Sequence, residues 1–255
     1  MNHEPDWTLH ETEARVRRSA AAIERARQQH AARLPDAPPP DLLGRALGQY
    51  FAILQRIEAD GGRIPADETP DPLPETDEDE YGVLCDYGLR LLGDLIRWAV
   101  ELDLEEERRE LEAMVVAAAL WTARMGGTIR PPEPVVNAVA HLANTTTGTE
   151  ALRRLSQVMY DLAAAMPEEI RADRDRSDPG RPWRVLMLNH GIIATRSHDP
   201  AEMEAVFDRI LALLPEDAPG FFAEGMEQMD IVGYPDHVRE VMQRYYELSH
   251  PRTLH

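Results

Sequence analysis

Along most of this chain, hydrophobic residues recur every three or four positions, the spacing that places them on one face of an α-helix. The clearest stripe consists of Met203, Val206, Phe207, Ile210, Leu211 and Leu214. Asp199 and Glu202 form a capping-box pattern ahead of it, and Pro200 suits the first helical turn. Because nearly every periodic segment has this spacing, we predict an all-α fold of about ten helices in antiparallel hairpins, partly solenoid-like.

Two segments allow more than one interpretation. Residues 80–125 are periodic throughout, and Asp103 suggests a new N-cap. We therefore expect two antiparallel helices that separate near Leu102, with a single long helix as the alternative. Residues 183–195 fit either a β-hairpin with its turn at Gly191 or a helix, and their helical surroundings favour a helix.

Segments rich in proline, glycine and charge divide the chain into predicted parts. Residues 1–62 are expected to form N-terminal helices that end at a Gly-Gly pair. Residues 63–80 are rich in proline and acids, which is typical of an exposed linker or loop. Residues 81–255 are predicted to form the main helical domain, with helix-hairpin repeats in residues 182–250.

A short repeat supports stacked hairpins. One helix ending, Met159, Leu162, Ala163, Met166, Pro167 and Glu168, matches a second, Phe207, Ile210, Leu211, Leu214, Pro215 and Glu216. In residues 182–250 an early aromatic, a turn glycine and three packing positions follow in order: Phe222, Gly233, Val238, Met242 and Tyr245. With them this segment resembles the tetratricopeptide-like family of α-helical repeats. The resemblance implies a solenoid-like second half and no catalytic activity, because such repeats mostly bind other proteins through a concave face.

The composition excludes several activities. All 27 basic residues are arginine, so the lysine of a phosphate-binding P-loop, of a kinase site or of a Schiff base is absent. No Gly-x-Ser-x-Gly motif is present. No set of residues has a familiar metal-ligand spacing, and we predict no metal and no cofactor. Cys85 is the single cysteine, which excludes an intrachain disulfide and fits a small core residue.

The charge of the chain points to the kind of partner. The net charge of −19 falls entirely on residues 41–255, because residues 1–40 hold six acids and six arginines. Nucleic acid and anionic membranes would be repelled, so we expect neither as a partner. The longest apolar stretch, Ala113 to Ala123, is too short to span a bilayer, and the N-terminus has no signal-peptide pattern. We therefore expect a cytoplasmic protein; the sequence leaves its oligomeric state open.

One short region concentrates polar chemistry beside apolar helix, namely Asn189, His190, Arg196 and His198. His190 has the chemistry of a general base near neutral pH, and Arg196 that of a carboxylate clamp, so these four are the candidate ligand-binding residues. The competing interpretation is structural, with His190 a hydrogen-bonded core residue and His198 a turn residue. No residue is predicted to be catalytic.

From these observations we expect a noncatalytic protein–protein interaction module that binds a segment of another protein in a helical groove. The alternative is a small all-α enzyme or ligand-binding protein with a buried pocket near His190. A groove would expose arginine and aromatic residues on a concave face, whereas a pocket would enclose converging polar groups with shifted pKa values.

Overall fold

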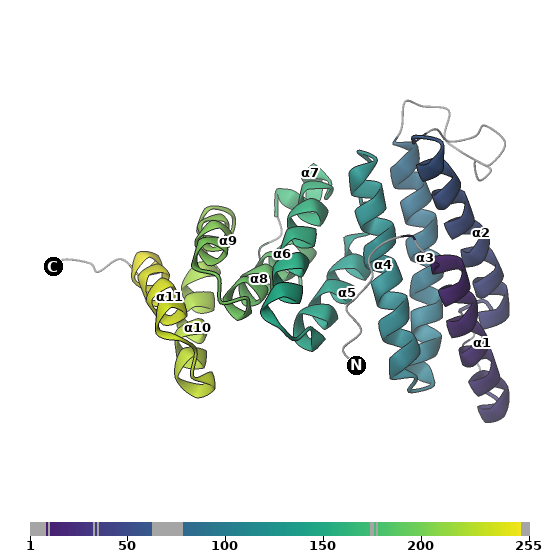
Figure 1. The fold of residues 1–255 in the computed structure, drawn as a ribbon, viewed down its shortest axis with the longest axis horizontal. Coiled ribbons are helices and arrows are strands. Elements are labelled where there is room, and N and C mark those ends of the chain that lie inside the picture. The colour runs from purple at the N-terminus through teal and green to yellow at the C-terminus, as the bar shows by residue number, and fades with distance from the viewer. Residues whose placement is uncertain are drawn as a thin grey trace. The chain divides into compact units, whose positions relative to one another are not determined.

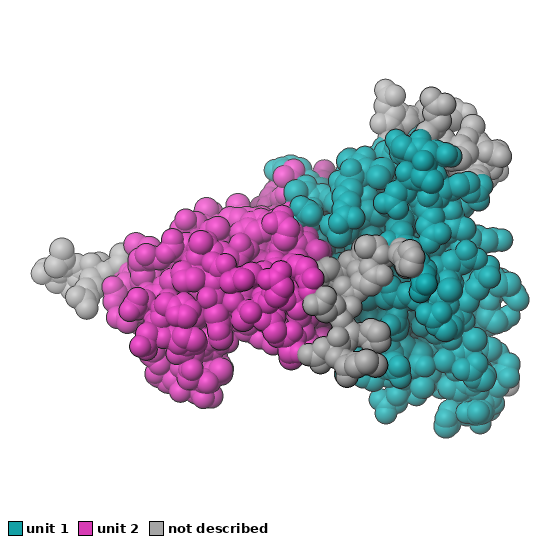
Figure 2. Space-filling model, viewed as in Figure 1, with its two compact units in different colours: residues 1–138, 161–168 teal, residues 139–160, 169–255 magenta. Residues whose placement is uncertain are grey.

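The computed structural model describes residues 9, 11–32, 34, 36–62, 79–173, 176 and 178–250, and this part of the chain contains eleven α-helices and no strand (Figure 1). The predicted all-α fold is confirmed. The chain divides into two compact units, residues 1–138 with 161–168 and residues 139–160 with 169–255 (Figure 2). These units do not coincide with the parts predicted from the sequence, which were residues 1–62, 63–80 and 81–255. Of the predicted linker, residues 63–78 lie outside the described part.

The first unit is built on a closed bundle of four helices. These are α1 (Thr12–His30), α2 (Pro40–Ala59), α3 (Glu80–Glu101) and α4 (Glu105–Arg124). Both α1 and α3 pack against α2 and against α4. The indole Nε1 of Trp98 donates to the carbonyl of Pro38 over 2.8 Å, which ties the end of α3 to the segment before α2. As its apolar composition predicts, α4 is buried on all sides between Leu111 and Thr122.

The predicted separation of residues 80–125 into two helices is confirmed, but the predicted cap is not formed. Asp103 lies in the left-handed region, with φ of 54°, and Leu104 is the N-cap residue without a side-chain cap. The amide of Leu104 donates to the carbonyl of Ala99 over 2.8 Å. This hydrogen bond closes the last turn of α3, so Asp103 belongs to the end of α3.

The second unit contains α8 (Pro182–Arg196), α9 (Pro200–Leu213), α10 (Ala218–Val232) and α11 (Asp236–Ser249), together with all but the first residue of the short α7 (Glu168–Arg171). The boundary between the units falls within α5 (Pro132–Thr145) and α6 (Thr149–Ala164). Residues 183–195 are helical, as their surroundings favoured. Gly191 is a packing position there, since a Cβ atom would overlap the Phe221 ring and the Ile210 side chain.

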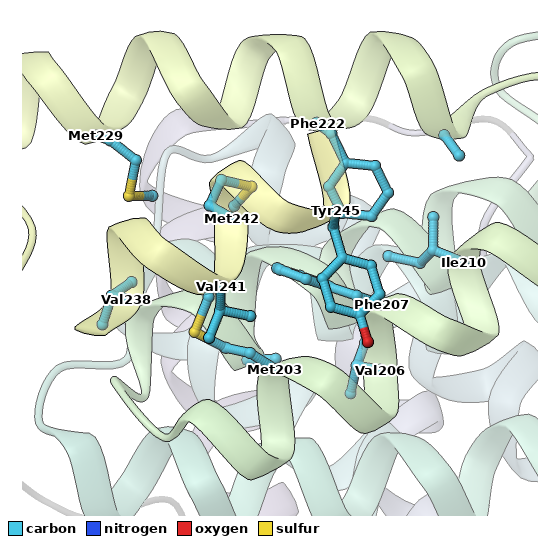
Figure 3. Packing of buried hydrophobic residues seen from close by; sticks show 12 residues of the cluster. Met203, Val206, Phe207, Ile210, Phe222, Met229, Val238, Val241, Met242 and Tyr245 are labelled. Carbon is cyan, nitrogen blue, oxygen red and sulfur yellow. The ribbon is translucent and has the colours of Figure 1, made fainter. Parts of the chain in front are cut away.

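The hydrophobic core of the second unit comes from α8, α9, α10 and α11, and aromatic rings of the last three helices meet in it (Figure 3). The ring centroid of Phe207 on α9 lies 5.0 Å from that of Phe222 on α10 and 5.2 Å from that of Tyr245 on α11. Both contacts are edge-to-face, an arrangement that aromatic rings prefer. The predicted stripe of α9 is thus a core face. Among the described residues, none of the helices combines the length and apolar character that crossing a membrane requires.

Candidate functional site

The four predicted ligand-binding residues lie in or directly after α8, but they do not converge on one point. The side-chain amide of Asn189 donates to the carbonyl of Val185 over 2.8 Å, one turn earlier in the same helix. His198 has a left-handed φ of 56°, and its ring packs edge-on against Tyr234 at 5.5 Å between centroids. Asn189 therefore makes a local contact within α8, whereas His198 is a turn residue whose ring contacts the segment after α10.

The side chain of Arg196, the last residue of α8, reaches the C-terminal end of α5. Its guanidinium donates to the carbonyl of Ala143 and, over 2.8 Å, to the carbonyl of Thr146, at the end of α5. These carbonyls include ones that a helix terminus leaves without an intrahelical partner. A cation at this position also interacts favourably with the helix dipole. The observed contacts of Arg196 thus stabilise the last turn of α5.

His190 is at the centre of a largely buried polar cluster. The other three predicted residues, Asn189, Arg196 and His198, are not part of it. The Nε2 atom of His190 lies 2.8 Å from the Oγ atom of Ser156 on α6, and Ser156 is hydrogen-bonded to the carboxylate of Glu202 on α9. Tyr160 packs edge-on against the imidazole at 4.6 Å, and the guanidinium of Arg209 stacks on Tyr160 at 4.7 Å from its centroid. We call these five residues the His190 cluster.

Helical spacing assembles the His190 cluster. Ser156 and Tyr160 are four residues apart on α6, and Glu202 and Arg209 are seven apart on α9, so each pair shares one face of its helix. His190 meets both faces from α8. Sequence proximity pointed instead to Arg196 and His198, which lie elsewhere. A polar Ser156 within an apolar helix stripe was the signal for the missed partners, because a buried hydroxyl needs a hydrogen-bond partner.

The electrostatics of the His190 cluster keep the imidazole neutral. Burial, followed by the nearby Arg209 cation, lowers the pKa of His190 to about 3. Burial and the Glu202 carboxylate raise the pKa of Tyr160. Since the hydroxyl of Ser156 donates to Glu202, the Nε2–H of His190 donates to Ser156. The Nδ1 atom of His190 is then an unprotonated acceptor, buried without a hydrogen-bond partner.

This chain of hydrogen bonds differs from a catalytic Ser-His-acid arrangement. In a triad the acid binds the ring nitrogen that faces away from the serine, which orients the imidazole as a base. Here the Glu202 carboxylate lies 3.9 Å from Nε2, the nitrogen that already contacts Ser156. Ser156 is fully buried, and His190 with a pKa of about 3 is a weak base. The geometry is that of a structural hydrogen-bond network, Glu202–Ser156–His190, which joins α6, α8 and α9 and which we call the lock.

The role of Glu202 in this lock corrects the predicted capping box of α9. Asp199 does cap the helix, with its carboxylate accepting from the amides of Ala201 and Glu202. The reciprocal bond from Glu202 is not made, because the amide of Asp199 donates to the hydroxyl of Ser197 instead. The carboxylate of Glu202 takes no part in the cap and accepts a hydrogen bond from Ser156.

The other candidate reactive groups and hollows of the described residues offer no catalytic arrangement. Cys85 is buried, and burial raises the pKa of its thiol to about 12, so the nucleophilic thiolate is not formed near neutral pH. In the first unit, a shallow hollow of about 310 Å³ lies between the ends of α4 and α6. Small residues line it, with Arg124 and Asp161 as its charged groups. Among the described residues, no group of three or more histidine, cysteine or acidic side chains has the arrangement of a metal site.

Comparisons with protein-family models, with curated proteins and with solved structures gave no match. The resemblance to tetratricopeptide-like repeats thus stays a prediction from the sequence. The ligand-binding role of Asn189, His190, Arg196 and His198 also stays a prediction, and their described contacts are with groups of the protein itself.

Proposed function

We propose that this protein is a noncatalytic interaction module that binds a segment of another protein on the surface of its helices. The observation that carries the proposal is a pair of adjacent aliphatic side chains at the end of α10. Ile231 is 75% exposed and Val232 is 60% exposed. Apolar surface left in water is unfavourable, and contiguous exposed apolar patches mark interaction sites. A partner that covers both side chains would gain the free energy of their burial.

The state of the chemically versatile side chains supports binding over catalysis. Ser156 and His190 are buried and hydrogen-bonded to each other, and Cys85 is a buried thiol with a raised pKa. A nucleophile or general base must reach its substrate, and these three groups are enclosed. The lysine-free composition adds to this argument, because it removes several cofactor and phosphate chemistries at once.

The alternative from the sequence, an enzyme or ligand carrier with a pocket near His190, receives less support. Such a pocket requires polar groups that face a hollow. In the His190 cluster the imidazole is covered by the Tyr160 ring and hydrogen-bonded to Ser156. Both His190 and Ser156 are fully buried, so neither side chain is open to solvent.

A defined complex in solution would test the proposed function. The tagged full chain, recovered from its native organism under mild conditions, should retain a protein partner that mass spectrometry identifies. That partner and this chain, produced separately and mixed, should then co-elute in size-exclusion chromatography at a fixed stoichiometry. The proposal would be contradicted if the purified pair forms no complex, or if the chain retains a small molecule and converts it.

A further inference from the structure

We infer that the outer face of α10 is the docking surface and that it binds a basic, amphipathic segment of another protein. This inference rests on the proposed function and names its surface and the chemistry of its partner. The outer face of α10 is defined by residues one helical turn apart on its solvent side: Gly220, Glu224, Glu227, Gln228 and Ile231. All five are exposed.

Helix geometry places Ile231 directly away from the core. It follows the fully buried Phe222 by nine residues, which corresponds to about 180° around a helix that turns about 100° per residue. Glu224 and Glu227 precede Ile231 by seven and four residues, so they lie on its side of the helix. An isoleucine at this position contributes nothing to the core that Phe222 and Met229 fill.

The two glutamates supply a negative charge that the protein does not neutralise. Among the described residues, neither Glu224 nor Glu227 has an ion-pair partner, whereas the nearby Asp230 is 2.6 Å from the guanidinium of Arg239. Residues 218–249 hold six acids and two arginines. A partner helix with cations three or four residues apart would pair with both glutamates, and a large apolar residue beside them would cover Ile231.

Charge also decides between the possible occupants of this face. A second copy of this chain would bring another net charge of −19 and the same two glutamates, so the copies would repel each other. Anionic membranes and nucleic acid are repelled for the same reason. A cationic segment with an apolar side is attracted by the glutamates and gains from covering Ile231 and Val232.

A synthetic peptide probe tests the inference on the full chain. The probe is a fluorescent helical peptide of about 16 residues, long enough to form a helix, with arginine and leucine sharing one side; a control peptide carries glutamate for arginine. We expect saturable binding of the arginine peptide by fluorescence anisotropy, weakened when salt rises from about 50 to about 300 mM. The glutamate peptide should not bind. Absence of arginine-peptide binding would overturn the inference.

Paired variants locate the binding surface. E224Q/E227Q should weaken binding about three- to tenfold, the loss of two exposed charge pairs. E58Q/E101Q removes two exposed glutamates of the first unit and changes the net charge equally, yet should change the affinity less than about twofold. Equal losses in both double variants would show that only the overall charge acts, which contradicts the assignment of this face.

The apolar contribution has its own matched pair. I231S should weaken the binding of the arginine peptide, whereas L248S, which changes a side chain on α11 that is 60% exposed, should not. Circular dichroism melts confirm that both variants are folded. The native partner separates the two levels of the proposal: if it binds wild type and E224Q/E227Q/I231S equally, this face is wrong and the proposed function stands. If the chain forms no complex with any protein, the proposed function itself fails.

Discussion

The carboxylate of Glu202, in the first turn of α9, is hydrogen-bonded to Ser156 of α6 and not to the amide of Asp199 at the start of its own helix. The bond joins residues 46 positions apart, whereas a capping box would join residues three apart. Ser156 in turn bonds His190, so one hydroxyl connects three helices. Losing this hydroxyl would therefore deprive both His190 and Glu202 of this hydrogen-bond partner in a region largely shielded from water.

The first prediction concerns this hydroxyl. Ser156→Ala should lower the free energy of unfolding by about 1–3 kcal/mol, because His190 and Glu202 both lose a partner. In a double-mutant cycle with Glu202→Gln, the coupling energy should be at least about 0.5 kcal/mol. Urea denaturation measures both. Ser249→Ala, at an end of α11 where the hydroxyl bonds only local groups, is the control and should cost less than about 1 kcal/mol. Additive effects in the cycle would contradict the lock.

The second prediction concerns the aromatic core of the second unit. Phe207 is fully buried against the rings of Phe222 and Tyr245, so Phe207→Ala should cost about 3–5 kcal/mol. Ala205→Gln, at an exposed position of the same helix, should change the stability by less than about 0.5 kcal/mol. Thermal and urea unfolding compare the two variants. Similar losses would mean that the buried face of α9 is assigned wrongly.

The sequence predicts helices well here because each helix carries its own periodic stripe. The predicted stripe at Met203 and Phe207 becomes the core face of α9, and the apolar run of α4 is buried on all sides. The break after α3 was also predicted, but its cap was not. Asp103 occupies a left-handed turn that closes α3, a choice between two local hydrogen-bond patterns that composition does not decide.

The site was harder to predict because sequence neighbours on a helix point in different directions. His190 and Arg196 are six residues apart, which corresponds to about 240° around α8, so they contact different elements. The partners of His190 come from helices that precede and follow α8 in the chain. Spacing on one helix predicts which residues share a face, but it does not predict which faces of separate helices meet.

The third prediction concerns Arg196. Its guanidinium reaches two carbonyls at the end of α5, those of Ala143 and Thr146, whereas a lysine ammonium is a single point charge on a flexible stem. Arg196→Lys should therefore lower the stability by about 1.5–3 kcal/mol, the range of a lost hydrogen bond to a charged group. Arg124→Lys, at an exposed residue of α4, should leave it within about 0.5 kcal/mol. Unchanged melting of Arg196→Lys would contradict a structural role.

The fourth prediction is a pH dependence that originates at His190. Its pKa is about 3 in the folded protein and about 6.5 in the unfolded chain. Below pH 6.5 the unfolded chain binds a proton that the folded protein does not, so acidification favours unfolding. This group should therefore remove about 2–3 kcal/mol of stability between about pH 6 and pH 4. The stability conferred by His190 is retained above its unfolded pKa and is lost progressively as the pH falls toward 3.

His190→Gln separates this effect from the titration of the carboxylates. The variant should be less stable than wild type at pH 7, because Gln fills the space poorly and alters the bond to Ser156, but its stability should fall less steeply on acidification. The difference between the two proteins, measured by urea denaturation at a series of pH values, should thus shrink toward pH 4. His237→Gln, at an exposed histidine, should follow the wild-type slope. Parallel slopes for wild type and His190→Gln would show that His190 takes up its proton in the folded state, and that the imidazole is not held neutral by burial.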